Sequence, residues 1–485
     1  MKLSRRTFVK STALAVSAMA MPALSYGRVM GTNDKVRAAV VGLNSRGKSH
    51  ILGMGNNLVA VCDCDEKVLG EQAEPLDVQK FKDYRKLCDS NEIDAITIAT
   101  PNHTHSLIAI QALMSGKDVY CEKPVSHNVW EGRQLVECVA RHKRICQSGT
   151  QSRSSTALQS AVAAVQAGKF GEIQYALGTC YKPRLSIGKL DKPLEIPKTI
   201  DYDLWCGPAE KRDLFRPKFH YDWHWDFNTG NGDMGNQGIH QMDIARWFLG
   251  CDTISPRVIS IGGRLGYKDA ADTPNSQTVI HDYPDAPLIF ETRGLPKSKK
   301  FQDRSAWSKN MDRYRGSKIG VIVQCENAYV VCSNSYNKVS AFDNDGNQIQ
   351  EWSGTDNHFA NFLEAVEAQD SSLLNAPIVE GHISSALCHT GGISHRLGEK
   401  TTSDEIKAAL ENEGDYFKDS YDRLAKHLKA NGIDIDTEKA LTLGAELNFD
   451  IETEAVVDND QASQLMARKG RVGFEIPDMT MKSAG

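Results

Sequence analysis

Residues 37–47 read RAAVVGLNSRG, a short apolar run that leads into a turn containing two glycines. An unbroken apolar run of this kind is typical of a strand buried on both faces of a parallel sheet. Gly42 and Gly47 match the first and last glycines of the G-x-G-x-x-G loop that binds dinucleotides, and Asn44 replaces the middle one. Because asparagine tolerates a positive φ better than most residues, we expect the turn to survive.

A second apolar run, residues 58–62, ends at Asp63, close to the spacing of about twenty residues expected between such a loop and its acidic partner. A carboxylate at this position accepts hydrogen bonds from a ribose hydroxyl and repels a 2′-phosphate. The sequence therefore predicts NAD as the cofactor, in preference to NADP. The alternative is that Asp63 only caps the following helix.

A third apolar run, residues 93–100, ends at Thr100, and Asn102 and His105 follow at once. Apolar strands that alternate with helices predict a doubly wound parallel sheet, the Rossmann type of α/β fold. Ligands of such sheets bind at the carboxyl ends of the strands. We therefore expect these three residues near the cofactor, although a histidine at a helix start often has no chemical role.

A fourth run, residues 117–121, is followed by Glu122, Lys123 and Pro124. Proline ends the strand, because its nitrogen cannot donate to the ladder. Lys123 is thus placed at the ligand edge of the sheet, where an ammonium group can hold a substrate hydroxyl and lower its pKa. A solvent-exposed loop between strand and helix is the alternative.

These motifs, in this order and spacing, resemble the glucose–fructose oxidoreductase / inositol dehydrogenase (Gfo/Idh/MocA) family over about residues 36–398. The resemblance implies that Glu122 and Arg46 also belong to the cofactor site. The residues expected to bind the cofactor are Gly42, Asn44, Arg46, Gly47, Asp63, Thr100, Asn102, His105 and Glu122. Those expected to contact the substrate are Lys123, Gln151, Arg153, Trp225 and Asp243.

The family pattern also places a catalytic pair on a helix of the second half, where this chain has Asn236 and His240. At positions i and i+4 the two side chains share one helical face. Histidine is suited to accept a hydroxyl proton near neutral pH. Many members have Asp where Asn236 stands, and an amide cannot support a charged imidazole as a carboxylate does. We expect Lys123, His240 and Asn236 to form the catalytic group, with Asp243 orienting His240 or lying on the helix surface.

An aromatic stretch between residues 205 and 227 precedes this helix and contains Trp225. Aromatic rings stack on the apolar faces of sugars, but core packing explains most aromatic side chains. His220 and His224 would bind a metal only on a helix, which the nearby Pro217 disfavours. We therefore predict no metal site.

The strand-like runs between residues 172 and 342 predict an α+β second domain with a large, mostly antiparallel sheet. The expected domains are a nucleotide-binding domain (36–150), a substrate and oligomerisation domain (151–400), a charged helical insertion (401–442) and a tail that packs on the body (443–485). The resemblance implies that the open face of this sheet makes subunit contacts, so we expect a homo-oligomer, a dimer or tetramer.

The first 27 residues predict a twin-arginine export signal, with SRRTFVK at 4–10 followed by a mild apolar stretch at 11–25. The predicted location is the periplasm. We find no other run of about eighteen apolar residues and expect no stable membrane anchor.

The whole sequence of 485 residues has a net charge of −5, which gives no basic field and makes nucleic acid an unexpected partner. The leading prediction is an NAD-dependent oxidoreductase that transfers hydride between nicotinamide and a hydroxyl of a sugar or glycoside, with the cofactor retained between turnovers. An NAD-assisted glycoside hydrolase and a non-catalytic sugar-binding protein remain alternatives.

Overall fold

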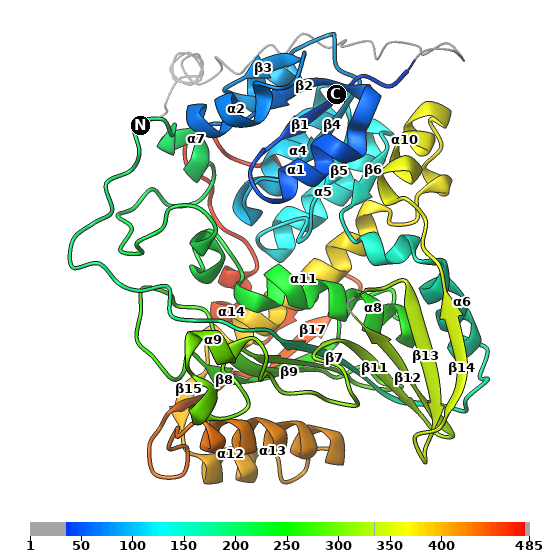
Figure 1. Cartoon of the computed structure of the whole chain (residues 1–485), viewed down its shortest axis with the longest axis vertical. Helices are drawn as coiled ribbons and strands as arrows, with labels where there is room; N and C mark the ends of the chain where they lie inside the picture. Colours follow the sequence, from blue (N-terminus) through cyan, green and yellow to red (C-terminus); the bar gives the residue numbers. More distant parts are fainter. Residues whose placement is uncertain (1–34, 334, 481–485) are drawn as a thin grey trace, which may run out of the picture.

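The computed structural model describes residues 35–333 and 335–480, and the predicted export signal lies outside them. Two sheets organise these residues, one in the nucleotide-binding domain and a larger one in the second domain (Figure 1). Within the described residues, no helix combines the length and the apolar character needed to cross a membrane.

The nucleotide-binding domain contains a six-stranded parallel sheet of order β3-β2-β1-β4-β5-β6 in the described residues, which confirms the predicted doubly wound fold. Its strands are β1 (Ala38–Val41), β2 (Leu58–Cys62), β3 (Gln79–Phe81), β4 (Ala95–Ile98), β5 (Asp118–Cys121) and β6 (Cys146–Ser148). Its helices are α1 (Arg46–Met54), α2 (Glu66–Ala73), α3 (Tyr84–Cys88), α4 (His105–Met114) and α5 (Val129–His142). The strand order reverses between β1 and β4, the point at which such sheets bind ligands.

The second domain contains a twelve-stranded sheet among the described residues, mostly antiparallel as predicted, with β7 and β10 as its parallel pair. Its strands are β7 (Ile173–Tyr181), β8 (Arg257–Gly263), β9 (Ser276–His281), β10 (Leu288–Arg293), β11 (Ile319–Cys325), β12 (Ala328–Ser333), β13 (Lys338–Asp343), β14 (Gln348–Ser353), β15 (Glu399–Thr401), β16 (Leu441–Leu443), β17 (Leu447–Asp450) and β18 (Ala455–Val457).

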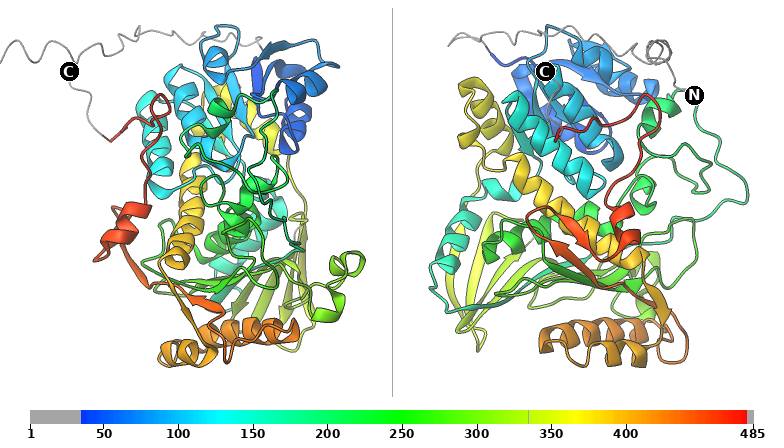
Figure 2. Two further views of the ribbon diagram at one scale, coloured as in Figure 1. Left: turned by 90° about the vertical axis from the view of Figure 1, so that its left-hand side faces the viewer. Right: turned by 180° about the vertical axis from the view of Figure 1, so that it is seen from behind.

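Helices cover both faces of this large sheet (Figures 1 and 2). On the face toward the nucleotide-binding domain lie α6 (Thr156–Gln166), α8 (Ile239–Leu249) and α11 (Ile378–Arg396). On the opposite face lie α12 (Ser403–Ala409) and α13 (Asp415–Ala430), from the charged insertion. The other helices are α7 (Tyr202–Cys206), α9 (Arg304–Trp307), α10 (His358–Ala368) and α14 (Asp460–Leu465).

The insertion covers the sheet with one apolar stripe of α13. Phe417, Tyr421, Leu424 and Leu428 recur three or four residues apart, so they share one face of the helix. All four are buried, and α13 packs against β9 and β10. The part of the sheet that the resemblance implies for subunit contacts is therefore partly covered by the chain itself.

The carboxyl-terminal segment returns from the large sheet to the nucleotide-binding domain (Figure 2). Phe474 and Met479 are buried in the core around β4, β5 and α4. Arg141 of α5 donates to the Met479 carbonyl oxygen at 2.6 Å. The tail thus ties the two domains together.

Candidate active site

A cavity of about 350 Å³ lies at the carboxyl ends of β1, β2, β4 and β5. Residues 199–229, an irregular segment of the second domain, form its outer wall. This segment is fixed to the nucleotide-binding domain by backbone hydrogen bonds from Glu66 to Thr199 and from Asp201 to Cys64. The predicted site residues that line the cavity are Gly42, Asn44, Arg46, Asp63, Thr100, Asn102, His105, Glu122, Lys123 and Asn236.

The turn after β1 has room for glycine alone at its two ends. Gly42 has a φ of +85°, and a Cβ there would lie 2.8 Å from the backbone of Thr100. A Cβ on Gly47 would lie 2.0 Å from the Gly42 carbonyl oxygen. Between them, Ser45 has the positive φ, and Asn44 does not. The Asn44 side-chain oxygen accepts a hydrogen bond from the Ser45 backbone amide at 2.9 Å. Asn44 thus stabilises the turn through a hydrogen bond, and not through the left-handed conformation that we expected.

Asp63 lines the cavity beyond β2 with its carboxylate held in place. One oxygen accepts from the Leu43 amide and the other from the Asp65 amide, both at 2.9 Å. The cap of helix α2 is Asp65, which accepts from the Lys67 amide at 3.0 Å. The helix cap, which was the alternative role for Asp63, is therefore formed by Asp65. The remaining acceptor capacity of Asp63 fits a ribose diol, and the glycine turn fits a pyrophosphate.

Glu122 is the buried anion at the centre of the sheet edge. Its Oε1 accepts from Arg46 Nε at 2.6 Å and from Gln151 Nε2 at 3.0 Å, and lies 3.1 Å from His50 Nε2. Burial alone would raise the pKa of Glu122, but Arg46, His50 and Lys123 outweigh it and hold this pKa well below its usual value. Gln151 lies outside the lining of the cavity and acts on Glu122 instead.

His105 joins the ends of two strands. Its ring nitrogens lie 2.7 Å from the carbonyl oxygens of Thr100 and Pro124. Burial lowers the pKa of His105. The side chain therefore holds the loops after β4 and β5 at a fixed distance, and Asn102, which follows β4, reaches across to donate to Asn231 at 3.1 Å.

Lys123 points from the nucleotide-binding domain to the second domain. Its Nζ donates to the Asn236 carbonyl oxygen at 2.5 Å. Burial, together with the positive charges of Arg46 and Lys182, lowers the pKa of Lys123 to about 8 against the opposing effect of Glu122. A lysine with this pKa exists in part as the neutral amine near pH 8, so it can accept a proton.

Asn236 lies in a π-helical turn, Met234–Gly238, immediately before α8. Such a turn has more residues per turn than an α-helix, so Asn236 and His240 do not have the i, i+4 geometry expected on an α-helix. His240 lies outside the cavity lining, and its Nδ1 is buried with no hydrogen-bond partner among the described residues. Burial and then Lys123 lower the pKa of His240 to about 3, so the imidazole is neutral at pH 7.

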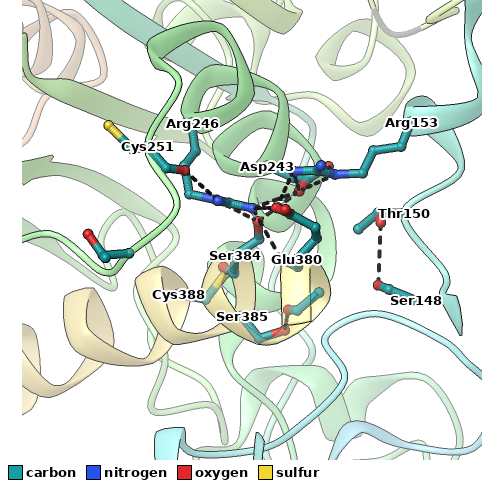
Figure 3. Close-up of polar contacts among 12 residues, drawn as sticks. Ser148, Thr150, Arg153, Asp243, Arg246, Cys251, Glu380, Ser384, Ser385 and Cys388 are labelled. Atoms are coloured by element: carbon teal, nitrogen blue, oxygen red, sulfur yellow. Dashed lines mark hydrogen bonds and ion pairs between the residues drawn. The ribbon is translucent and has the colours of Figure 1, made fainter. Parts of the chain in front are cut away.

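Arg153 and Asp243 form a buried ion pair instead of the expected substrate contacts (Figure 3). The Asp243 carboxylate accepts three hydrogen bonds from the Arg153 guanidinium at 2.9 to 3.0 Å, and one from Ser384 Oγ at 2.8 Å. Glu380 of α11 bridges Arg153 and Arg246. Asp243 is fully buried in this network, so it is held by arginines and does not orient His240.

Trp225 is also buried away from the cavity, with the Arg184 guanidinium 4.6 Å from its ring centre. Its neighbours Tyr221, Trp223 and His224 line the cavity in its place. Across the described residues, no group of three histidine, cysteine or acidic side chains could hold a metal ion.

Sequence reasoning missed Lys182, which follows the last residue of β7. Its Nζ lies 3.5 Å from Gln237 Oε1, next to the residue that Lys123 contacts. The signal was its position directly after a long buried strand, the same kind of position that identified Lys123.

Two family models match the chain. Residues 36–150 match the NAD-binding Rossmann fold of the Gfo/Idh/MocA oxidoreductase family, and residues 173–301 match that family's C-terminal alpha/beta domain. The chain belongs to the Gfo/Idh/MocA family. Both the predicted resemblance and the predicted fold are thus confirmed.

Characterised relatives match parts of the chain. The scyllo-inositol 2-dehydrogenase (NAD(+)) of Bacillus subtilis is 31% identical over 237 residues, which are 48% of this chain and 58% of that protein. A glycosyl hydrolase family 109 protein of Shewanella pealeana is 29% identical over 177 residues, 30% of this chain and 39% of that protein. The matches therefore span less than two thirds of these relatives. A structure of levoglucosan dehydrogenase with NADH and levoglucosan has a TM-score of 0.55 at 16% identity, and covers 73% of this chain and 95% of that one.

Proposed function

We propose that this protein is an NAD-dependent oxidoreductase that transfers hydride between nicotinamide and a hydroxyl group of a sugar or glycoside. The observation that carries the proposal is the position of Lys123, whose ammonium group lies in the same cavity as the glycine turn and Asp63. A proton-accepting group beside a nucleotide cradle is the arrangement that oxidation of an alcohol needs.

The position of each residue in the cavity indicates its role in the proposed reaction. The turn between Gly42 and Gly47 would hold the pyrophosphate, and Asp63 would accept from the ribose hydroxyls. A bound nicotinamide nucleotide supplies the hydride acceptor. As the neutral amine, Lys123 Nζ holds the substrate hydroxyl and takes its proton, while the Asn236 side-chain amide in the same cavity positions a second hydroxyl.

This division changes the base assignment that the sequence favoured. The pKa of His240, lowered to about 3, makes the imidazole a weak proton acceptor, whereas the pKa of Lys123, lowered to about 8, lies close to the working pH of most enzymes. Lys123 is therefore the base in this proposal, and His240, which lies outside the cavity lining, is assigned no direct contact with the substrate.

NAD is favoured over NADP because the Asp63 carboxylate would repel a 2′-phosphate. Asp65 adds a second negative charge nearby, and its carboxylate lies 3.0 Å from His220 Nε2 on the outer wall. An Asp63→Ala variant should bind NAD more weakly and lose most of its discrimination against NADP. Equal affinity of the unmodified protein for both nucleotides would contradict this preference.

A second candidate function is an NAD-assisted glycoside hydrolase, which oxidises, eliminates, hydrates and reduces in turn. The match to a glycosyl hydrolase family 109 protein supports it. This reaction begins with the same oxidation, so the roles of Lys123 and the cavity are unchanged. The non-catalytic alternative, a sugar-binding protein, predicts no bound nucleotide.

One experiment separates the three functions. The purified full-length protein is denatured, and the released nucleotide is identified by chromatography and mass spectrometry. The folded protein is then incubated with nitrophenyl glycosides and with free sugars. Aglycone release without net NADH supports the hydrolase, and a keto-sugar product supports the oxidoreductase. Absence of nucleotide, together with no binding of added NAD, would exclude both enzymes.

We further propose export to the periplasm by the twin-arginine route, supported by residues 4–25 of the sequence. An exported enzyme has little access to free NAD, which favours a retained cofactor and hydride exchange between two sugars. Replacement of Arg5 and Arg6 by lysine should keep the protein in the cytoplasm, as cell fractionation would show.

A homo-oligomer is proposed as well, through the part of the large sheet that α12 and α13 leave uncovered. Strands β11 to β14 form this part, and Ile349 of β14 has half of its side chain exposed. Light scattering of the purified protein tests this proposal, and a monomer at micromolar concentration would contradict it.

A further inference from the structure

Two lysine side chains reach the same short turn of the second domain. Lys123 Nζ donates to the Asn236 carbonyl oxygen at 2.5 Å, and Lys182 Nζ lies 3.5 Å from Gln237 Oε1. Since Asn236 and Gln237 are adjacent, the two ammonium groups lie near the same turn, Lys123 in the lining of the cavity and Lys182 beside that lining. Within the part of the chain that the structure describes, neither lysine has a carboxylate oxygen within 4.0 Å.

The acidic groups nearby are bound to other cations. Glu122 is shared among Arg46, His50 and Gln151, and Asp233 is paired with Arg184. Among the described residues named here, two carboxylates stand against four cations, which leaves an excess of positive charge. The cations are Lys123, Lys182, Arg46 and Arg184.

Two histidines, one in the lining of the cavity and one outside it, lie close to the same positive charges. His224 belongs to the outer wall and His240 to α8. Burial, with lesser contributions from the charges of Lys123 and Lys182, lowers the pKa of each to about 3. Lys182 thus lies close enough to act on both histidines, which are neutral at pH 7 and add no charge of their own.

An unpaired ammonium group in a partly buried site is unfavourable unless a ligand supplies the opposite charge. Lys123 has its own use in the proposed reaction, because it accepts a proton from the hydroxyl. Lys182 has no such use, and its ammonium group lies beside Gln237, at the turn that Lys123 contacts from within the cavity. A negative group on the substrate would offset its charge.

We propose that the substrate is an anionic sugar, a uronate or a sugar phosphate, whose negative group binds Lys182 while Lys123 holds the hydroxyl that is oxidised. Lysine binds carboxylate and phosphate alike as a point charge. This inference rests on the proposed function, because it names the substrate class of the same site.

The test compares each negatively charged sugar with an uncharged partner, with the full-length protein loaded with NAD. The pairs are glucuronate with glucuronamide, galacturonate with galacturonamide, and glucose 6-phosphate with glucose. We measure Kd by titration calorimetry and KM where oxidation occurs. In at least one pair the acid should bind about tenfold or more tightly than its uncharged partner, since a hydrogen bond to a charged group is worth at least this factor. The uronate and phosphate pairs distinguish the two sources of charge.

Substitutions at Lys182 connect the preference to this side chain. Lys182→Gln should bring the ratio of acid to uncharged partner close to one, and Lys182→Arg should restore it, because the guanidinium keeps the charge. Lys338→Gln, at an exposed lysine of β13 paired with Glu351, is the matched control and should keep the ratio of the unmodified protein. Thermal midpoints check that each variant is folded.

The outcomes separate this inference from the proposed function. Equal affinity within every pair, or a preference that survives in Lys182→Gln, would overturn the anionic substrate. An acid that binds through Lys182 but is never oxidised would support the anion site and contradict the proposed function. Neither binding nor oxidation of any of these sugars would overturn both.

Discussion

Two clusters of charged side chains, one that includes residues of helix α8 and one at the turn before it, differ in how their charges are paired. In the first, Arg153, Asp243, Arg246 and Glu380 pair with one another, and the fully buried Asp243 carboxylate has a cation on each side (Figure 3). In the second, Lys123 and Lys182 contact an uncharged turn. The paired cluster joins α8 and α11 to the turn at residues 151–154, whereas the unpaired one leaves its charges available to a ligand.

The difference separates residues that build the site from residues that carry out its chemistry. A paired buried network is costly to break, because removal of one member leaves an uncompensated charge. An unpaired charge instead destabilises the folded state. Functional sites commonly contain such destabilising groups, because the same groups are reactive. Substitutions in the two clusters should therefore change stability in opposite directions.

The largest effect is expected in the paired cluster. Asp243→Ala should lower the free energy of unfolding by about 3 to 5 kcal/mol, because Arg153 and Arg246 are left buried without their shared carboxylate. Urea denaturation followed by fluorescence measures this change. Glu351→Ala, at an exposed pair, is the control and should leave the midpoint almost unchanged. If Asp243→Ala loses activity but keeps its full stability, Asp243 takes part in the reaction and the structural role is wrong.

Lys123→Met should have the opposite effect and raise the free energy of unfolding at pH 7 by up to about 3 kcal/mol. The pKa of Lys123 is about 8 in the folded chain and 10.5 in an unfolded one. Below pH 8 the lysine is charged in both states, so the folded state carries the full penalty. Between pH 8 and 10.5 the unfolded chain binds more protons, so the stability of the unmodified protein rises.

The gain in Lys123→Met should therefore shrink as the pH rises through this window. Denaturation curves at pH 7, 9 and 10.5 test this dependence. If the variant is less stable than the unmodified protein at pH 7, Lys123 is held by favourable contacts and the contrast between the clusters fails.

The pH dependence of activity should follow Lys123 as well. The neutral amine is the form that accepts a proton, so the rate of sugar oxidation should rise about tenfold per pH unit below 8 and level off above it. Initial rates between pH 5.5 and 9.5 with saturating NAD measure this profile. A rate that levels off near pH 6.5 would instead identify a histidine as the base.

The smallest effect is expected from Lys182→Gln on this profile. Because Lys182 is a lesser cause of the lowered pKa of Lys123, behind burial and Arg46, its loss should move the midpoint of the profile upward by less than about one pH unit. A downward movement would show that the two ammonium groups do not interact as their positions indicate.

Much of the nucleotide-binding half could be predicted from the sequence, because its signals are local. Buried parallel strands are continuous apolar runs, so β2 has the predicted bounds, and the turn and Asp63 follow at fixed spacing. Strand β14 was missed, because its exposed edge position lets polar residues such as Gln348 and Glu351 replace an apolar pattern.

The second half of the site depends on contacts that sequence spacing cannot give. Arg153 and Asp243 are 90 residues apart, and nothing local shows that they pair. The family resemblance predicts a substrate role for Arg153, and the position one turn after His240 predicts one for Asp243, but neither signal shows that the two side chains pair. Trp225 was chosen among several aromatic residues, but the path of the outer wall, fixed by long-range hydrogen bonds, places Tyr221 and Trp223 at the cavity instead.

The central claim is that hydride passes between a sugar carbon and a nucleotide held beside Lys123. The most direct test uses sugars deuterated at every carbon, incubated with the NAD-loaded full-length protein. The nucleotide is then released by denaturation and weighed by mass spectrometry. We predict a nucleotide that has gained one deuterium, and no gain in Lys123→Met although that variant retains its nucleotide. A nucleotide without deuterium after incubation with neutral and acidic sugars alike would contradict the account.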